Sequence, residues 1–147
     1  MRHSRRKVPG TARATCDLEA LERLIEELRE ASDGGAAIIV EGIKDRRSLR
    51  ELGIEGTIMT AAMRPALEVA EDAAQNFDEI IVLTDWDRAG EEAARRMEKH
   101  LLCTRAHADL QTRDRLKKMV RREIKDVEGL SRYVQRMRAE ACPSGWL

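Results

Sequence analysis

The chain is poor in aromatic residues and in proline. Its 147 residues include one Phe, one Tyr, two Trp and three Pro. Val, Ile, Leu, Met and Ala must therefore fill the core, and the 42% apolar content is sufficient for this. The length fits one compact domain with short extensions, whereas two full domains would be crowded.

The cysteines are also few and scattered. Cys16, Cys103 and Cys142 are odd in number and form no C-x-x-C pair, which argues against a disulfide framework and against a zinc knuckle. We therefore expect a reducing, cytoplasmic compartment. No apolar run approaches transmembrane length, and the basic N-terminus lacks the apolar stretch of a signal peptide, so no membrane association is expected.

Charge is abundant but unevenly distributed along the chain. The formal net charge is zero. Residues 17–33 carry seven acidic residues against two arginines, a net charge of −5. Residues 104–138 carry eleven Lys and Arg against five acidic residues, a net charge of +6. This polarity is compatible with a phosphate partner, and ordinary solvated helix faces explain it equally well.

Short apolar runs alternate with segments of helical periodicity. We expect strands at 36–40, 56–60, 79–84 and, from a weaker alternation, 104–110. We expect helices at 17–33, 44–52, from Pro65 to Phe77, from Gly90 onward, at 111–123 and at 128–140. This order predicts a Rossmann-like α/β fold with a parallel sheet of about four strands, an extra N-terminal helix and two C-terminal helices. Residues 1–16 are expected to form a disordered basic arm.

Acidic residues follow two of the expected strands. Glu41 comes directly after the first strand, and Asp85 and Asp87 come directly after the third. The carboxyl ends of parallel strands share one edge of a sheet, so these side chains are expected to converge there. Because three carboxylates would repel one another, a hard cation such as Mg²⁺ is favoured. The alternative is helix capping, which Asp87 can provide and which is the favoured role of Asp45.

The segments Val40-Glu41-Gly42 and Thr84-Asp85-Trp86-Asp87-Arg88-Ala89-Gly90 resemble the two signatures of the Toprim family. The resemblance covers a core of about 34–110, with 111–147 as a C-terminal helical extension. It is greatest to small stand-alone archaeal Toprim proteins, to the nuclease that matures 5S ribosomal RNA and to the Toprim domain of bacterial-type primases. The family pattern differs at Ile43, where many nucleases have lysine, and at residues 60–63, which lack a common glycine.

The resemblance implies roles for the acidic residues. Glu41 would act as the acid/base or metal-binding glutamate, and Asp85 and Asp87 would bind Mg²⁺. Up to two Mg²⁺ ions are expected, with Mn²⁺ as a substitute. Independently of the resemblance, the position of Asp126 and Glu128 between the last two expected helices allows them to add ligands near the metal, although capping of the last helix is the favoured role.

Several activities can be weighed against the sequence. A topoisomerase needs a tyrosine on a separate large domain, and a primase needs more chain. A phosphatase of the haloacid dehalogenase type places its D-x-D after the first strand, whereas here it follows the third. Two functions remain: a Mg²⁺-dependent nuclease, with RNA favoured over DNA as the substrate, and a non-catalytic RNA-binding or ribonucleoprotein component.

Basic residues are expected to contact the nucleic acid. The candidates are Lys44, Arg88, Arg113, Lys117 and Arg121. The last three recur at i, i+4 and i+8 on the 111–123 helix, which predicts one basic face. The alternative is a solvated helix without a partner.

Overall fold

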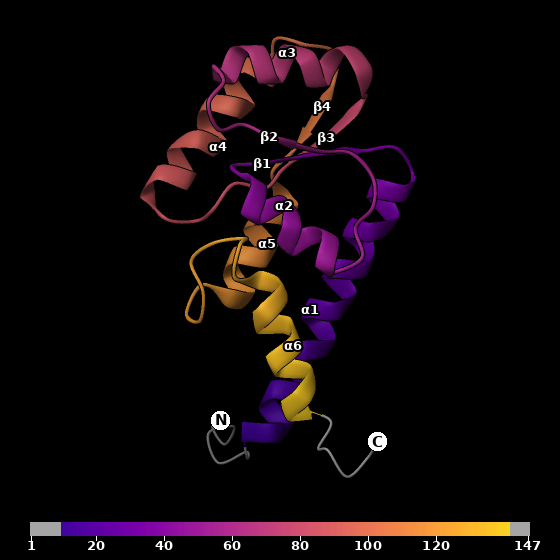
Figure 1. Ribbon diagram of the computed structural model, residues 1–147, viewed down its shortest axis with the longest axis vertical. Coiled ribbons are helices and arrows are strands. Elements are labelled where there is room, and N and C mark those ends of the chain that lie inside the picture. The colour runs from indigo at the N-terminus through magenta and orange to yellow at the C-terminus, as the bar shows by residue number, and fades with distance from the viewer. Residues whose placement is uncertain (1–9, 142–147) are drawn as a thin grey trace, which may run out of the picture.

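The computed structural model describes the backbone of residues 10–141 and the side chains of residues 18–141 (Figure 1). Its elements, in chain order, are α1 (Gly10–Asp33), β1 (Ala37–Val40), α2 (Ile43–Glu51), β2 (Ile58–Thr60), α3 (Ala66–Asn76), β3 (Glu79–Val82), α4 (Arg88–Leu101), β4 (His107–Asp109), α5 (Gln111–Val120) and α6 (Leu130–Ala141). The predicted α/β fold with four strands, an N-terminal helix and two C-terminal helices is thus confirmed.

The largest difference between the predicted and observed boundaries lies at the N-terminus. Helix α1 begins at Gly10 rather than at Asp17, so residues 10–16 of the expected disordered arm are helical. This stretch has no large apolar side chain to reveal a periodicity, but it contains alanines and an arginine, which are good helix formers. Residues 1–9 of the arm, and the C-terminal residues 142–147, lie outside the described residues.

The four strands form one parallel sheet in the order β2-β1-β3-β4. Strand β1 pairs with both β2 and β3, so that Ile39 lies between Met59 and Val82. Every residue of β1 is buried, as its uninterrupted apolar sequence predicts. From β1 the chain turns outward to β2, and from β3 it turns outward to β4. The crevice between β1 and β3 is therefore the switch point at which such sheets place their functional groups.

Helices cover both faces of the sheet. Helices α3 and α4 pack on one face through a cluster that includes Val69, Ala73 and Met97. The other face is covered by α1, α2, α5 and α6, whose buried leucines and valines meet Ile38 and Val40 of the sheet. Figure 1 shows α1 and α6 side by side at the end away from α3. No helix within residues 10–141 combines the length and the apolar character needed to cross a membrane.

The acidic N-terminal segment and the basic C-terminal segment partly neutralise each other through ion pairs between helices. Arg138 of α6 forms two hydrogen bonds to Glu22 of α1, at 2.6 and 2.8 Å. Arg115 of α5 bonds Glu27 of α1 at 2.7 Å. The acidic N-terminal helix therefore lies against the basic C-terminal helices. These pairs are exposed, and each contributes at most about 1 kcal/mol of stability.

Candidate functional site

The three predicted carboxylates lie at the carboxyl ends of β1 and β3. Oε2 of Glu41 accepts a hydrogen bond from the backbone N–H of Asp85 at 3.0 Å, which joins the two strand ends. Asp87 is the N-cap of α4, and its Oδ1 accepts from the Gly90 N–H at 2.7 Å. The charge of Asp87 raises the pKa of Glu41, and the charge of Glu41 in turn raises the pKa of Asp85. The structure therefore brings together the residues that the sequence singles out.

The electrostatics of this cluster are those of crowded acids. Burial, together with the charges of Asp45, Glu41 and Asp126, raises the pKa of Asp85 from the usual 3.8 to about 7, against a lowering by the Val127 N–H. Burial is also the main cause of the raised pKa of Glu41. The negative charge here is poorly compensated by the protein, which is the condition that favours a bound cation.

Two further acids belong to the cluster. Asp45 is 6% exposed, and its Oδ2 accepts from the Gly42 N–H at 3.0 Å, so it caps α2 as favoured from the sequence. Asp126 accepts from the Gly129 N–H at 2.9 Å, which is a capping contact before α6. Yet the charge of Asp126 also raises the pKa of both Asp45 and Asp85. Both residues thus combine a structural role with a place at the edge of the site.

The loop between α5 and α6 is held directly against the D-x-D segment. Trp86 donates from Nε1 to the Ile124 carbonyl at 2.8 Å and from its backbone N–H to the Lys125 carbonyl at 3.3 Å. The Val127 N–H donates to Oδ1 of Asp85 at 2.9 Å. The C-terminal segment is therefore a wall of the site rather than an appendage to it.

The sequence predicts that Arg113 belongs to an exposed basic face, and the structure shows that it is buried instead. Its side chain is 2% exposed, and its guanidinium donates to the carbonyls of Thr84 at 2.9 Å and Asp85 at 2.6 Å. It also pairs with Glu91 at 3.3 Å, and Lys117 is bound to the same carboxylate. Arg113 therefore supports the D-x-D backbone from inside and is not available to a phosphate. Of the predicted row, Arg121 is exposed and forms no ion pair within residues 18–141.

The remaining predicted phosphate contacts are accessible. Lys44 stands on the first turn of α2, three residues after Glu41, and Arg88 opens α4 directly after Asp87. Both are exposed. The structure thus leaves Lys44 and Arg88 beside the acidic cluster, where the sequence places them.

Steric crowding explains why the D-x-D-x-x-G pattern ends in a glycine, Gly90. A Cβ at Gly90 would overlap the carbonyl oxygen of Asp85, because the turn brings the start of α4 back onto the strand end. The buried hydroxyl of Thr84 closes the same turn by donating to the Gly90 carbonyl at 2.8 Å. Only a residue without a side chain fits at this position.

We accordingly expect Gly90→Ala to displace the D-x-D segment and to lower the free energy of unfolding by about 3 kcal/mol, the upper range for overpacking a tight site. Gly42→Ala is the matched control, because the nearest atom to a Cβ there is 4.0 Å away. That variant should lose less than about 1 kcal/mol. Urea unfolding of both variants measures the difference, and equal losses would show that the Gly90 turn has room to relax.

The donor set fits a hard divalent cation. Within residues 18–141, no group of three or more acidic, histidine or cysteine side chains is arranged so that it could hold a metal ion by itself. Glu41, Asp85 and Asp87 each direct one oxygen at a backbone N–H, and each has a second carboxylate oxygen. Mg²⁺ commonly takes only one or two carboxylates and completes its shell with water and phosphate oxygens, so a full protein cage is not required.

Comparison with known proteins agrees with the fold and with the position of this site. The sequence profile of the Toprim domain matches residues 36–122, which include α5 as well as the predicted core. The chain therefore belongs to the Toprim domain family, whose members generally bind Mg²⁺ and act in nucleic-acid metabolism.

Within that family, its relatives are archaeal UPF0292 proteins. The chain is 40% identical over 121 residues to one from Methanosarcina barkeri, covering 82% of this chain and 85% of the relative. It is 41% identical over 109 residues to one from Pyrococcus horikoshii, covering 74% and 80%. Among solved structures, a protein from Aquifex aeolicus superposes with a TM-score of 0.65 at 28% identity, covering 74% of this chain and 95% of that one.

Proposed function

We propose that this protein is a cytoplasmic, Mg²⁺-dependent phosphodiesterase that acts on nucleic acid, with RNA preferred over DNA. The observation that carries the proposal is the contact between Glu41 and the Asp85 backbone at the switch point, where half-buried and poorly compensated carboxylates meet. Such a cluster suits a cation that in turn attracts a phosphate. The family membership supports a role in nucleic-acid chemistry.

The chain's own residues have separable roles in this proposal. Asp85 and Asp87 would hold up to two Mg²⁺ ions, which would supply charge stabilisation for the attacking and leaving oxygens. Glu41 is held by the Asp85 N–H at Oε2, so its other oxygen can accept a proton from a water molecule. Its raised pKa makes it a stronger base than an exposed glutamate. Lys44 and Arg88 would bind the phosphates on either side.

The decisive test is cleavage of labelled structured RNAs and DNAs in Mg²⁺, in Mn²⁺ and with a chelator. Wild type should cleave only with metal. Glu41→Gln keeps an acceptor for the Asp85 N–H but cannot take a proton, so its rate should fall by about 100-fold or more while binding persists. Glu71→Gln, at an exposed position on α3, is the control and should cleave like wild type. Equal rates for wild type and Glu41→Gln would point to a contaminating nuclease.

A second candidate is a non-catalytic RNA-binding or ribonucleoprotein component. The observation in its favour is that Glu41, Asp85 and Asp87 each already serve a backbone N–H, so each has a structural role that needs no reaction. This candidate predicts binding without cleavage in every metal condition of the same experiment.

A further inference from the structure

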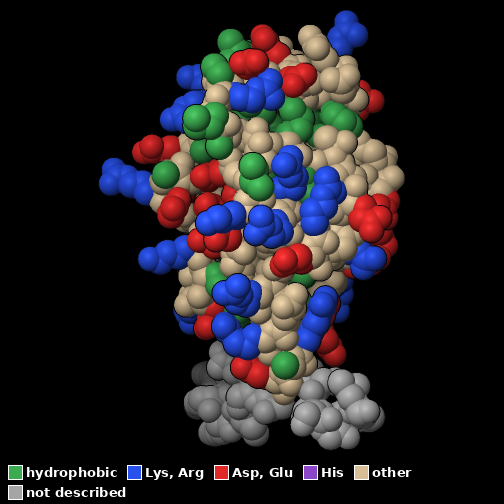
Figure 2. Space-filling view, viewed as in Figure 1, with side chains coloured by type: hydrophobic (Ala, Val, Ile, Leu, Met, Phe, Trp, Pro, Cys, Tyr) green, Lys and Arg blue, Asp and Glu red, His purple; other side chains and the backbone are tan. Residues whose placement is uncertain are grey.

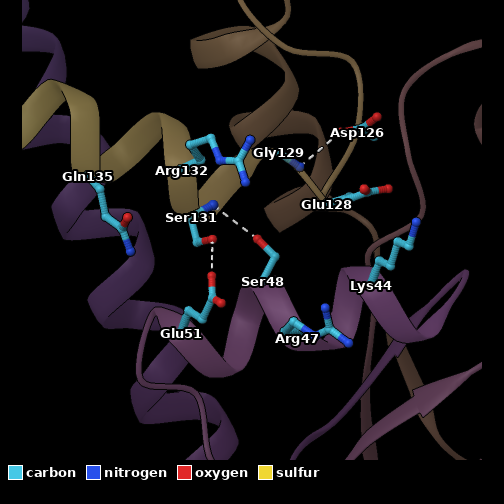
Figure 3. A pocket seen from close by; sticks show the side chains of 10 residues that line it. All are labelled: Lys44, Arg47, Ser48, Glu51, Asp126, Glu128, Gly129, Ser131, Arg132 and Gln135. Atoms are coloured by element: carbon cyan, nitrogen blue, oxygen red, sulfur yellow. Dashed lines mark hydrogen bonds between the residues drawn. The ribbon is translucent and has the colours of Figure 1, made fainter.

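A polar groove runs beside the carboxylate cluster, between α2 and α6. Its volume is about 570 Å³. Its lining consists of Lys44, Arg47, Ser48, Glu51, Asp126, Glu128, Gly129, Ser131, Arg132 and Gln135 (Figure 3). The lining residues from α6 and from the loop before it all lie beyond residue 122, where the Toprim match ends. The groove therefore depends on the C-terminal extension of this chain.

At the floor of the groove, polar side chains of α2 and α6 are joined by hydrogen bonds. The backbone N–H of Ser131 donates to the Ser48 hydroxyl at 3.0 Å, and the Ser131 hydroxyl donates to Glu51 at 2.6 Å. Both serines are buried. Packed helices usually meet through apolar side chains, so a fixed polar floor below an open groove indicates a surface built for a polar ligand.

The cations of the groove are free to bind that ligand. Lys44, Arg47 and Arg132 are exposed and form no ion pair with any residue in the described part of the chain. In Figure 3, Arg47 from α2 and Arg132 from α6 extend from opposite walls. Figure 2 shows Lys and Arg side chains gathered over the middle of the face on which α2 lies.

The acids of the groove do not cancel these cations evenly. Glu51 is engaged by the Ser131 hydroxyl at the floor. Asp126 and Glu128 lie at the other end, where their charges act on Asp45 of the carboxylate cluster. In Figure 3, Lys44 lies at the same end as Asp126 and Glu128, and the two arginines lie further along the groove.

We propose that this groove binds the sugar-phosphate backbone of a single strand of nucleic acid and leads it to the carboxylate cluster. The inference rests on the proposed function, because the cluster supplies the end point of the path. Two packed helices have axes only about 10 Å apart, so the groove between them suits one strand rather than a duplex. No aromatic side chain lines the groove, so binding should depend on phosphates and show little base preference.

The test measures binding of a fluorescent oligouridylate of about 12 nucleotides, a typical single-strand site size, in chelator so that no metal contributes. Each phosphate contact on a single strand carries a salt slope of about −0.7. Arg47→Gln with Arg132→Gln should therefore flatten the slope by about 1.4 and weaken binding about tenfold or more at low salt. The control, Lys99→Gln with Arg105→Gln, removes two exposed cations near the opposite edge of the sheet and should leave the slope unchanged.

A second variant keeps the inference testable if the first folds poorly. Gln135→Lys adds a cation to the groove and should steepen the slope by about 0.7. Wild-type slopes for both groove variants would overturn the inference, as would a wild-type protein that binds no oligouridylate. Loss of binding in the arginine variant, with no cleavage by wild type in any metal, would instead support the groove and overturn the phosphodiesterase.

Discussion

Calorimetry on Asp85→Asn with Asp87→Asn should show no Mn²⁺ binding, while the metal-free variant should melt at a higher temperature than wild type. Asparagine keeps the oxygen that accepts the N–H groups of Val127 and Gly90. The backbone contacts therefore survive, and only the negative charges are removed. Without a cation those charges repel Glu41 and cost stability, whereas with a cation they are the ligands.

The stability gain should depend on pH. The pKa of Asp85 in the folded protein is raised from 3.8 to about 7, so the folded state binds its proton more tightly than the unfolded state does. Metal-free wild type must then lose stability as the pH rises from about 4 to about 7, and the variant lacks this loss. The melting temperature of the variant should exceed that of wild type more at pH 8 than at pH 5.

The matched control removes two acids from the opposite edge of the same strands. Asp33 precedes β1 and Asp78 precedes β3, and both are exposed. Asp33→Asn with Asp78→Asn should leave Mn²⁺ affinity and the pH dependence as in wild type. Unchanged Mn²⁺ affinity in the Asp85 and Asp87 variant would show that the metal binds elsewhere in the protein.

The sheet and its acidic edge could be predicted because they depend on local patterns. Uninterrupted apolar runs identified β1 and β3 as strands buried on both faces, and parallel pairing then forced Glu41 and Asp85 to the same edge. In the loop after β2, Met63 has a left-handed backbone with φ of 68°, the conformation that glycine adopts most readily.

The parts that could not be predicted depend on contacts between distant segments. The indole of Trp86 reaches Ile124, 38 residues away, and no local pattern announces that bond. The burial of Arg113 did have a signal. Leu116 and Val120 follow it at i+3 and i+7, so Arg113 shares the apolar face of α5 that packs on the core. The i, i+4 and i+8 spacing of the basic residues describes a stripe but does not say whether it points outward.

Arg113→Ala should therefore lower the free energy of unfolding strongly instead of weakening nucleic-acid binding selectively. The substitution leaves the carbonyls of Thr84 and Asp85 without their buried donor and leaves Glu91 with Lys117 as its remaining partner. Removing one partner of a buried charged group costs about 3–5 kcal/mol. Arg113→Lys should recover only part of this, because an ammonium cannot match the planar fork that spans both carbonyls and the carboxylate.

Urea unfolding of the metal-free protein measures the loss, and Arg121→Ala is the control on the same helix. Arg121 is exposed, so its removal should change the free energy of unfolding by less than about 0.5 kcal/mol. Because Arg113 holds the carbonyl of Asp85, any folded Arg113→Ala protein should also bind Mn²⁺ more weakly, whereas Arg121→Ala should bind it normally. An Arg113→Ala protein with wild-type stability and Mn²⁺ affinity but a flatter salt slope for RNA would restore the basic face that the sequence predicts.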